Sequence, residues 1–257
     1  MTSVLELSCV TCRFDDGATV VEALREVSLR VDQGEMVAVV GPSGSGKSTV
    51  IHLACGLVAP DAGQVRILGE APPAVSWRRG GATLRSARGY RRWWADRRRT
   101  TIGVVHQRLN LVPALRAIDN VALPLRLAGW PASEALALAE EALAQVDASD
   151  LAGSWIDRLS MGQQQRIALA RATVGGHQLV LADEPTAALD TVGAEQVVGL
   201  LGRLAESGRA VLLVTHDTRV AAWADRIVVL RDGRTVDEVT SGTEPDNRAT
   251  APAGVVP

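Results

Sequence analysis

The sequence is nearly devoid of lysine: its 257 residues include 26 arginines but one lysine, Lys47. No apolar run approaches the ~18 residues that cross a bilayer, and residues 1–8 lack the basic and apolar regions of a secretion signal. The net charge of −2 provides no global positive field that would attract nucleic acid. These absences predict a soluble, cytosolic protein with no nucleic acid as a partner. The length of the chain is enough for one large α/β domain or two small ones.

Cysteine is also scarce, with three residues in the chain. Cys9 and Cys12 have the CxxC spacing of some metal and redox sites. The surrounding sequence alternates like a strand, however, and residues three apart on a strand point to opposite faces. No second CxxC and no nearby histidine accompanies the pair. We therefore expect buried strand cysteines.

The single lysine lies in the sequence GPSGSGKST, which matches the phosphate-binding pattern GxxxxGK[ST]. The apolar run MVAVV precedes it and helical apolar spacing follows, so the sequence predicts a strand, a glycine-rich loop and a helix. Backbone N–H groups of such a loop converge on phosphate oxygens, and the helix start adds positive potential. The predicted nucleotide-binding residues are Gly41, Pro42, Ser43, Gly44, Ser45, Gly46, Lys47, Ser48 and Thr49.

Three other apolar runs end close to polar side chains. LVLA is followed by Asp183 and Glu184, VLLV shortly precedes His216, and IGVV shortly precedes Gln107. Open parallel sheets bind ligands at the carboxyl ends of their strands, so we expect these side chains to meet there. Asp183 suits binding of Mg²⁺, and Glu184 suits polarising an attacking water.

The stretch LSMGQQQR, which begins at Leu159, opens another predicted helix. Ser160 and Gln163 fit a capping box, and Gly162 would permit close approach of a backbone. Free N–H groups at a helix start can bind an anion. An ordinary helix cap has the same pattern, so this motif alone leaves both interpretations open.

Taken together, the motifs resemble those of the ABC-transporter ATPases, from about residue 4 to residue 235. LSMGQQQRIALARA resembles the signature sequence of that family. GPSGSGKST is similar to its Walker A motif, LVLADE to its Walker B motif and AALD to its D-loop. Gln107 corresponds to the Q-loop glutamine and His216 to the switch histidine.

The resemblance implies ATP and Mg²⁺ as cofactors. It implies that Glu184 is the general base, that His216 holds the γ-phosphate, and that Phe14 stacks on adenine. A core position at a strand end is the alternative for Phe14. The implied catalytic residues are Glu184, His216, Lys47 and Gln107, and the implied Mg²⁺ ligands are Ser48, Gln107 and Asp183.

The resemblance also implies that two such domains pair head to tail, so that each signature helix completes the ATP site of the other. Ser160, Gly162 and Gln163 would contact the nucleotide of the partner, and Asp190 would lie at the dimer interface. Met161 departs from the glycine usual at its position, which could slow turnover. His106 precedes Gln107 where an aromatic residue is common, and it would border the groove that faces a permease.

We expect an α/β fold: a P-loop NTPase core with a mainly parallel sheet, an N-terminal antiparallel β lobe and an inserted α-helical signature lobe. By resemblance, residues 1–30 and about 62–70 form the β lobe, and residues about 108–172 form the helical lobe. The ATPase domain would span residues 1–239. Residues 240–257 are rich in Pro, Thr and Ala without periodicity, which predicts a disordered tail.

Residues 77–99 combine nine arginines with three tryptophans and the single tyrosine, and Asp96 is their one acidic residue. Segments of this kind can bind nucleic acid or anionic lipid headgroups. A solvated helix and contact with a permease are the other interpretations, and the sequence leaves them open.

NLVPALRAIDNVALPLRLAG, which starts at Asn110, most resembles the lipoprotein-releasing, macrolide-exporter and cell-division branch of the family. We therefore expect an ATP-hydrolysing subunit that forms a homodimer and binds a separately encoded transmembrane permease at the cytoplasmic face of the membrane. The alternatives are the ATPase of a mechanical complex without a transported substrate, a soluble ATPase acting on DNA or ribosomes, and a nucleotide-binding module without turnover.

Overall fold

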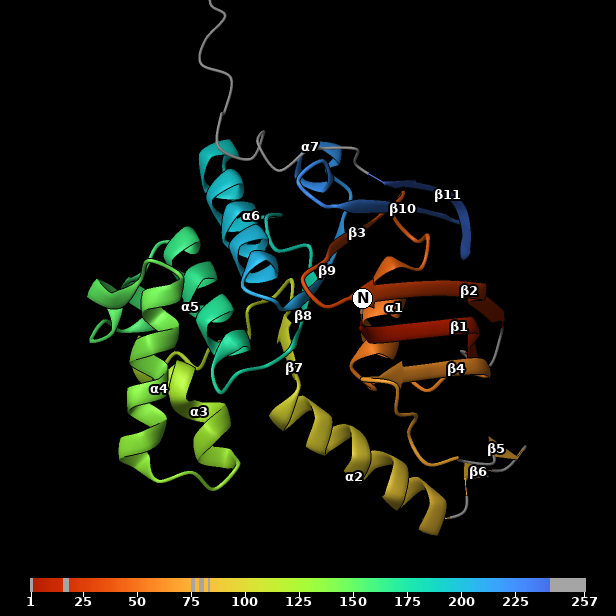
Figure 1. Cartoon of the computed structure of the whole chain (residues 1–257), viewed down its shortest axis with the longest axis horizontal. Coiled ribbons are helices and arrows are strands. Elements are labelled where there is room, and N and C mark those ends of the chain that lie inside the picture. The colour runs from red at the N-terminus through yellow and green to blue at the C-terminus, as the bar shows by residue number, and fades with distance from the viewer. Residues whose placement is uncertain (1, 16–18, 75–76, 79–80, 83, 241–257) are drawn as a thin grey trace, which may run out of the picture.

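A six-stranded sheet forms the centre of the molecule in the computed structural model, which describes residues 2–15, 19–74, 77–78, 81–82 and 84–240 (Figure 1). Five of its strands are parallel, and β11 pairs antiparallel at one edge. In spatial order the strands are β11 (Arg234–Thr240), β10 (Arg226–Arg231), β3 (Met36–Val40), β9 (Ala210–Thr215), β8 (Leu179–Asp183) and β7 (Ile102–Val105).

A separate three-stranded antiparallel sheet forms the β lobe and comprises β2 (Val20–Asp32), β1 (Ser3–Asp15) and β4 (Ala62–Ile67). The short helix α1 (Lys47–Ala54) follows β3 and shares one buried apolar cluster with this lobe. Helix α2 (Leu84–Thr100) connects the β lobe to β7, after a two-residue pairing of β5 (Trp77–Arg78) with β6 (Gly81–Ala82).

Helices cover the other face of the main sheet (Figure 1). Three of them, α3, α4 and α5, pack on one another as a helical lobe. Helix α5 also contacts β7 and α6. The elements of this side are α3 (Ala117–Leu127), α4 (Ala132–Gln145), the 3₁₀ turns η1 (Ser149–Leu151) and η2 (Ile156–Arg158), α5 (Met161–Thr173), α6 (Thr191–Glu206) and α7 (Thr218–Ala221).

The parallel strands are buried on both faces, which explains why their sequences are continuous apolar runs rather than alternating patterns. Along β3, Met36 and Ala38 join the cluster on the helical side, whereas Val37 and Val39 join the cluster shared with α1 and the β lobe. The side chains of β3 therefore contribute to the apolar clusters on both faces of the main sheet. The predicted fold class is confirmed, including the antiparallel β lobe and the inserted helices.

The cysteines differ partly from expectation. Cys12 is buried on β1, and burial raises the pKa of its thiol to about 11. Cys9 is exposed, because the strand is irregular there and Cys9 adopts a left-handed φ of 47°. The prediction that both are buried is wrong for Cys9.

The predicted tail, residues 240–257, lies outside the described residues except for Thr240, which ends β11. Within the part of the chain that the structure describes, no helix combines the length and the apolar character that crossing a bilayer requires.

Trp94 attaches α2 to the rest of the fold. Its indole is 1% exposed and lies against Gly56, just beyond the end of α1. Gly56 has a φ of 67°, and a Cβ added there would overlap the indole ring. The guanidinium of Arg98 adds a hydrogen bond to the Cys55 carbonyl at 2.8 Å.

We expect Gly56→Ala to lower the free energy of unfolding by about 2–5 kcal/mol. A left-handed alanine costs about 1–2 kcal/mol, and displacing a packed indole costs about 1–3 kcal/mol. Gly69→Ala is the matched control, because Gly69 has a φ of 77° but no atom within 4 Å of an added Cβ. Denaturant unfolding of both variants measures the difference, and equal losses would contradict the packing role of Trp94.

Candidate nucleotide-binding site

The predicted polar residues lie in one row along the carboxyl edge of the main sheet. Val40 of β3 is in register with Thr215 of β9, so the glycine-rich loop begins beside His216. Strand β9 pairs with β8, which ends in Asp183, and β8 pairs with β7, which leads to Gln107. The four predicted strands thus bring their polar groups to neighbouring positions, as expected.

The loop from Gly41 to Gly46 has the conformation that the glycine pattern predicts. Gly46 precedes α1 with a φ of 103°, which favours glycine. A Cβ at Gly46 would overlap the carbonyl oxygen of Ala23 on β2. The β lobe therefore abuts the loop, and the first helical N–H groups of α1 are free to face a ligand.

Lys47 is buried without a counter-ion. Its Nζ donates hydrogen bonds to the carbonyl oxygens of Gly41 at 2.8 Å and Pro42 at 2.9 Å. The residue is 8% exposed, and it forms no ion pair with any described residue. A buried ammonium held only by carbonyl dipoles gains strongly from a phosphate, because the phosphate supplies the missing negative charge.

Ser48 and Asp183 form a set of oxygen donors that fits Mg²⁺. The Ser48 hydroxyl donates to Asp183 Oδ1 across 3.2 Å, between α1 and β8. Burial raises the pKa of the Asp183 carboxyl, the hydrogen bond from Ser48 opposes that shift, and the neighbouring Glu184 raises it further. Hydroxyl and carboxylate oxygens are the hard ligands that Mg²⁺ prefers.

Glu184 is held in an unusual conformation next to His216. Its φ is 48°, a left-handed value that is strained for a residue other than glycine. Its Oε1 lies 2.9 Å from His216 Nδ1, while its buried Oε2 has no hydrogen-bond partner among the described residues. Glu184 is largely buried and His216 largely exposed. The carboxylate thus lies at the carboxyl ends of the strands, with one oxygen beside the His216 ring and the other buried and without a partner among the described residues.

Gln107 is exposed beyond β7, and Arg171 holds the chain that follows it. The Arg171 guanidinium donates to the carbonyls of Leu109 at 2.5 Å and Asn110 at 2.7 Å. Burial and the nearby Arg171 lower the pKa of His106, which precedes Gln107. Arg171 is not among the site residues predicted from the sequence. No local pattern indicates its role, because its partners lie about sixty residues away.

Phe14 is 43% exposed near the end of β1, where it pairs with Val21 of β2. Two residues further along β2, Ala23 contacts the glycine-rich loop at Gly46. The ring is therefore on the surface of the β lobe, close to the loop, and the alternative of a buried core position is wrong.

The predicted capping box at the start of α5 is present. Ser160 Oγ accepts from the Gln163 N–H at 3.3 Å, and Gln163 Oε1 accepts from the Ser160 N–H at 2.9 Å. Met161 is the first helical residue and is 47% exposed. Asp190 caps α6 in a similar way, through its Oδ1 and the Gly193 N–H at 2.8 Å.

The chain does not bring the start of α5 to its own glycine-rich loop. Helix α5 belongs to the helical lobe on one side of the main sheet, and α1 lies on the other side (Figure 1). Among the described residues no hydrogen bond joins Ser160, Gly162 or Gln163 to residues 41–49.

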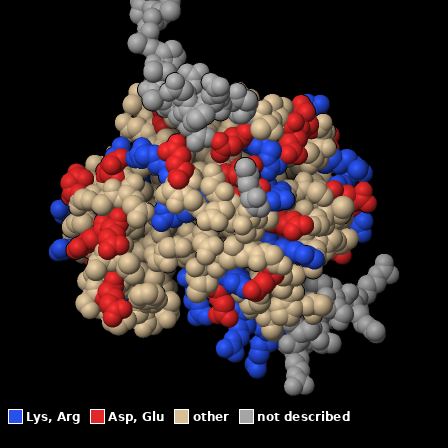
Figure 2. All heavy atoms as spheres, viewed as in Figure 1, with Lys and Arg blue, Asp and Glu red and all other residues tan. Residues whose placement is uncertain are grey.

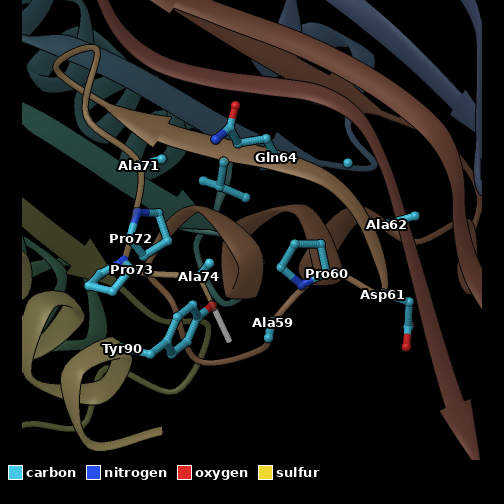
Figure 3. A pocket seen from close by; sticks show the side chains of 12 residues that line it. Ala59, Pro60, Asp61, Ala62, Gln64, Ala71, Pro72, Pro73, Ala74 and Tyr90 are labelled. Carbon is cyan, nitrogen blue, oxygen red and sulfur yellow. The ribbon is translucent and has the colours of Figure 1, made fainter. Parts of the chain in front are cut away.

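Two cavities lie away from all of these motifs. One of about 360 Å³ lies between β4, residues 71–74 and Tyr90 of α2, and is lined by Pro60, Pro72 and Pro73 (Figure 3). The other, of about 620 Å³, lies near His177, at the amino ends of strands β8 and β9. Neither contains a predicted nucleotide-binding residue, so the candidate site is the open row of strand ends.

Comparison with known proteins agrees with this geometry. The sequence model of the ABC transporter family matches residues 24–187. The chain is 39% identical over 247 residues to a macrolide export ATP-binding/permease protein, MacB, of Rhodopseudomonas palustris, covering 96% of this chain and 36% of that protein. It is 38% identical over 253 residues to MacB of Escherichia coli, covering 95% of this chain and 37% of that protein. The chain thus spans about a third of the length of these relatives.

A solved structure is similar over nearly the whole chain. It is a dimeric, post-hydrolysis state of the ATP-binding cassette MJ0796 bound to ADP and Pi, with a TM-score of 0.79 and 35% sequence identity. The match covers 92% of this chain and 98% of that one.

Proposed function

This chain belongs to the ABC transporter family of ATPases, and from that premise we propose that it hydrolyses ATP as a homodimer with two shared sites. Each site would use the glycine-rich loop of one chain and the start of α5 of the other. Opening and closing of the dimer during the ATP cycle would then supply the motion that drives an attached membrane protein.

Different residues of the chain would bind the phosphates of ATP, hold Mg²⁺ and activate the attacking water. Residues 41–49 would hold the phosphates, with Lys47 Nζ moving from its carbonyl partners to the β- and γ-phosphates. Ser48, Asp183 and Gln107 would hold Mg²⁺, which shields phosphate charge when bound. Glu184 would accept a proton from the attacking water, and His216 would orient Glu184 and the γ-phosphate.

Phe14 would complete the nucleotide contacts by stacking on adenine. Its half-exposed ring offers a π-face that a base can cover. The contact of β2 with the glycine-rich loop supports a nucleotide that lies with its phosphates in the loop and its base on the β lobe.

The observation that carries the shared-site proposal is the open surface at Gly162. A Cβ there would meet a single atom, Leu189 Cδ2, at 3.9 Å, so packing within the chain does not require glycine. Glycine in a helix costs about 1 kcal/mol relative to alanine. Glycine would be required at this position if a phosphate of a partner's nucleotide approaches the backbone between Ser160 and Gln163. Met161 would then stand beside that phosphate, and Asp190 would face the partner across the interface.

Mixing two inactive variants tests the shared site. Lys47→Met removes the phosphate lysine of one chain, and Ser160→Phe blocks the start of α5 of the other. Shared sites predict that each homodimer is inactive, whereas the mixed dimer has one site with an intact lysine and an intact Ser160. ATP hydrolysis should therefore reappear on mixing. No recovery, although the two chains form mixed dimers, would contradict the shared site, because it would mean that Lys47 and Ser160 act in the site of the same chain.

We also infer that the dimer acts on a permease at the cytoplasmic face of a membrane, in the manner that the names of its relatives suggest. Those relatives combine ATP-binding and permease functions in proteins about three times as long as the matched region. The surface around His106 and Gln107 would receive the permease. Co-purification of the tagged chain with a membrane protein, reduced by substitutions at His106, would support this step, and an unchanged yield would contradict it.

A further inference from the structure

Helix α2 attaches to the fold through one of its faces. Trp94 is buried there, and its ring forms T-shaped contacts with Tyr90 and Trp93. Arg97 stacks over Trp93 at 5.0 Å from the ring centroid and forms an ion pair with Glu70. These contacts occupy the aromatic residues and fix the orientation of the helix.

The opposite face of α2 is basic and has no partner within the described ranges. Arg88, Arg91 and Arg92 are exposed at the i, i+3, i+4 spacing of a single helix face. None of the three has a hydrogen bond or an ion pair with any residue in the described ranges. Figure 2 shows a group of Lys and Arg atoms projecting from the molecule where Figure 1 places α2. We call these three arginines the α2 basic face.

We propose that the α2 basic face binds the anionic phospholipid headgroups of the membrane that surrounds the permease. The three guanidiniums span about 6 Å along the helix axis, and they require only a surface of phosphate groups to pair with. The juxtaposition of a firmly attached helix with three free arginines supplies such a contact without inserting any side chain into the bilayer. The nearness of a membrane rests on the proposed function.

A lipid surface fits this face better than a nucleic acid does. Proteins that bind single strands stack bases on aromatic rings, but on α2 the rings of Trp93 and Trp94 are turned into the fold. The chain as a whole carries a net charge of −2. A nucleic acid that extends beyond the α2 basic face would therefore be repelled by the rest of the molecule. Headgroup binding uses local charge alone, and each arginine near an anionic surface strengthens it roughly fivefold.

Vesicle sedimentation with the purified 257-residue chain tests the proposal. Vesicles of phosphatidylcholine mixed with phosphatidylglycerol should retain the chain at low salt, and vesicles of phosphatidylcholine alone should not. The triple variant Arg88→Gln, Arg91→Gln, Arg92→Gln should bind the mixed vesicles about 10²-fold more weakly. The loss should shrink as salt is added, because salt screens exposed charges.

A second triple variant provides the matched control: Arg126→Gln, Arg231→Gln, Arg234→Gln. These arginines are exposed, form no ion pair among the described residues, and give the same change in net charge. Equal weakening by both triple variants would overturn the proposal in favour of a net-charge effect. Full binding by the first triple variant would also overturn it. Displacement from vesicles by a single-stranded oligonucleotide at lower concentration than lipid would identify a nucleic-acid surface instead.

ATP hydrolysis without vesicles separates this proposal from the proposed function. The α2 basic face lies outside the row of strand ends, so the first triple variant should hydrolyse ATP at the rate of the unmodified chain. Vesicle binding without any ATP hydrolysis by the unmodified chain would refute the proposed function. ATP hydrolysis without vesicle binding would refute the α2 proposal.

Discussion

Glu184→Gln should bind ATP with little change in affinity and hydrolyse it at least 10²-fold more slowly. A positioned general base contributes about 10²–10⁴ in rate, and glutamine cannot accept the proton. The substitution removes the carboxylate that the structure places beside His216, whose buried Oε2 has no partner in the described part of the chain. Single-turnover hydrolysis and the dimer fraction by light scattering are the measurements, and the dimer should persist in ATP.

Two comparisons make this expectation specific. Glu195→Gln changes the same charge on an exposed part of α6 and should leave hydrolysis unchanged. His216→Ala should slow hydrolysis, and adding it to Glu184→Gln should cost little more, because residues that act as a unit are not additive. Hydrolysis by Glu184→Gln at the native rate would show that another group accepts the proton.

The strand ends of the site could be predicted from the sequence because two local rules determine them. Apolar runs of four to six residues bounded by polar ones predict buried strands, and parallel strands align their carboxyl ends. All four predicted strands are present, and Asp183, His216 and Gln107 follow them as expected. The order of the strands across the sheet was not predicted, since no residue pattern encodes it.

The features that the sequence did not reveal depend on distant contacts or on backbone strain. The hydrogen bonds of Arg171 to residues 109 and 110 join two segments that only the folded chain brings together. The left-handed φ of Glu184 contradicts the ordinary preference of glutamate. The folded core around it must therefore stabilise that conformation, and no local sequence rule would predict it.

For residues 77–99, the sequence did not predict which side chains of the helix are buried. The sequence presents arginines and aromatic rings as one mixed segment, because it does not indicate which side of the helix is covered. The structure separates them. Trp94 is buried against Gly56, whereas Arg88, Arg91 and Arg92 remain on the surface. The interpretation as a uniformly solvated helix is therefore wrong for its aromatic face.

Lys47→Met should reduce ATP affinity by about 10²-fold and leave the fold intact. A charged hydrogen bond contributes about 1.5–3 kcal/mol, and methionine keeps the apolar stem while it removes the ammonium. Because the buried Lys47 ammonium has no counter-ion among the described residues, its loss should change the free energy of unfolding by less than about 1 kcal/mol. Calorimetric titration with ATP and denaturant unfolding measure the two quantities separately.

Lys47→Arg decides whether charge alone or the compact ammonium matters. The chain uses arginine at every other basic position, 26 in all, so nothing in its composition favours lysine here. A planar guanidinium is wider than an ammonium and cannot reach both Gly41 and Pro42 carbonyls in the same space. We expect Lys47→Arg to bind ATP about as weakly as Lys47→Met. Native affinity in the arginine variant would mean that the loop recognises charge without regard to shape.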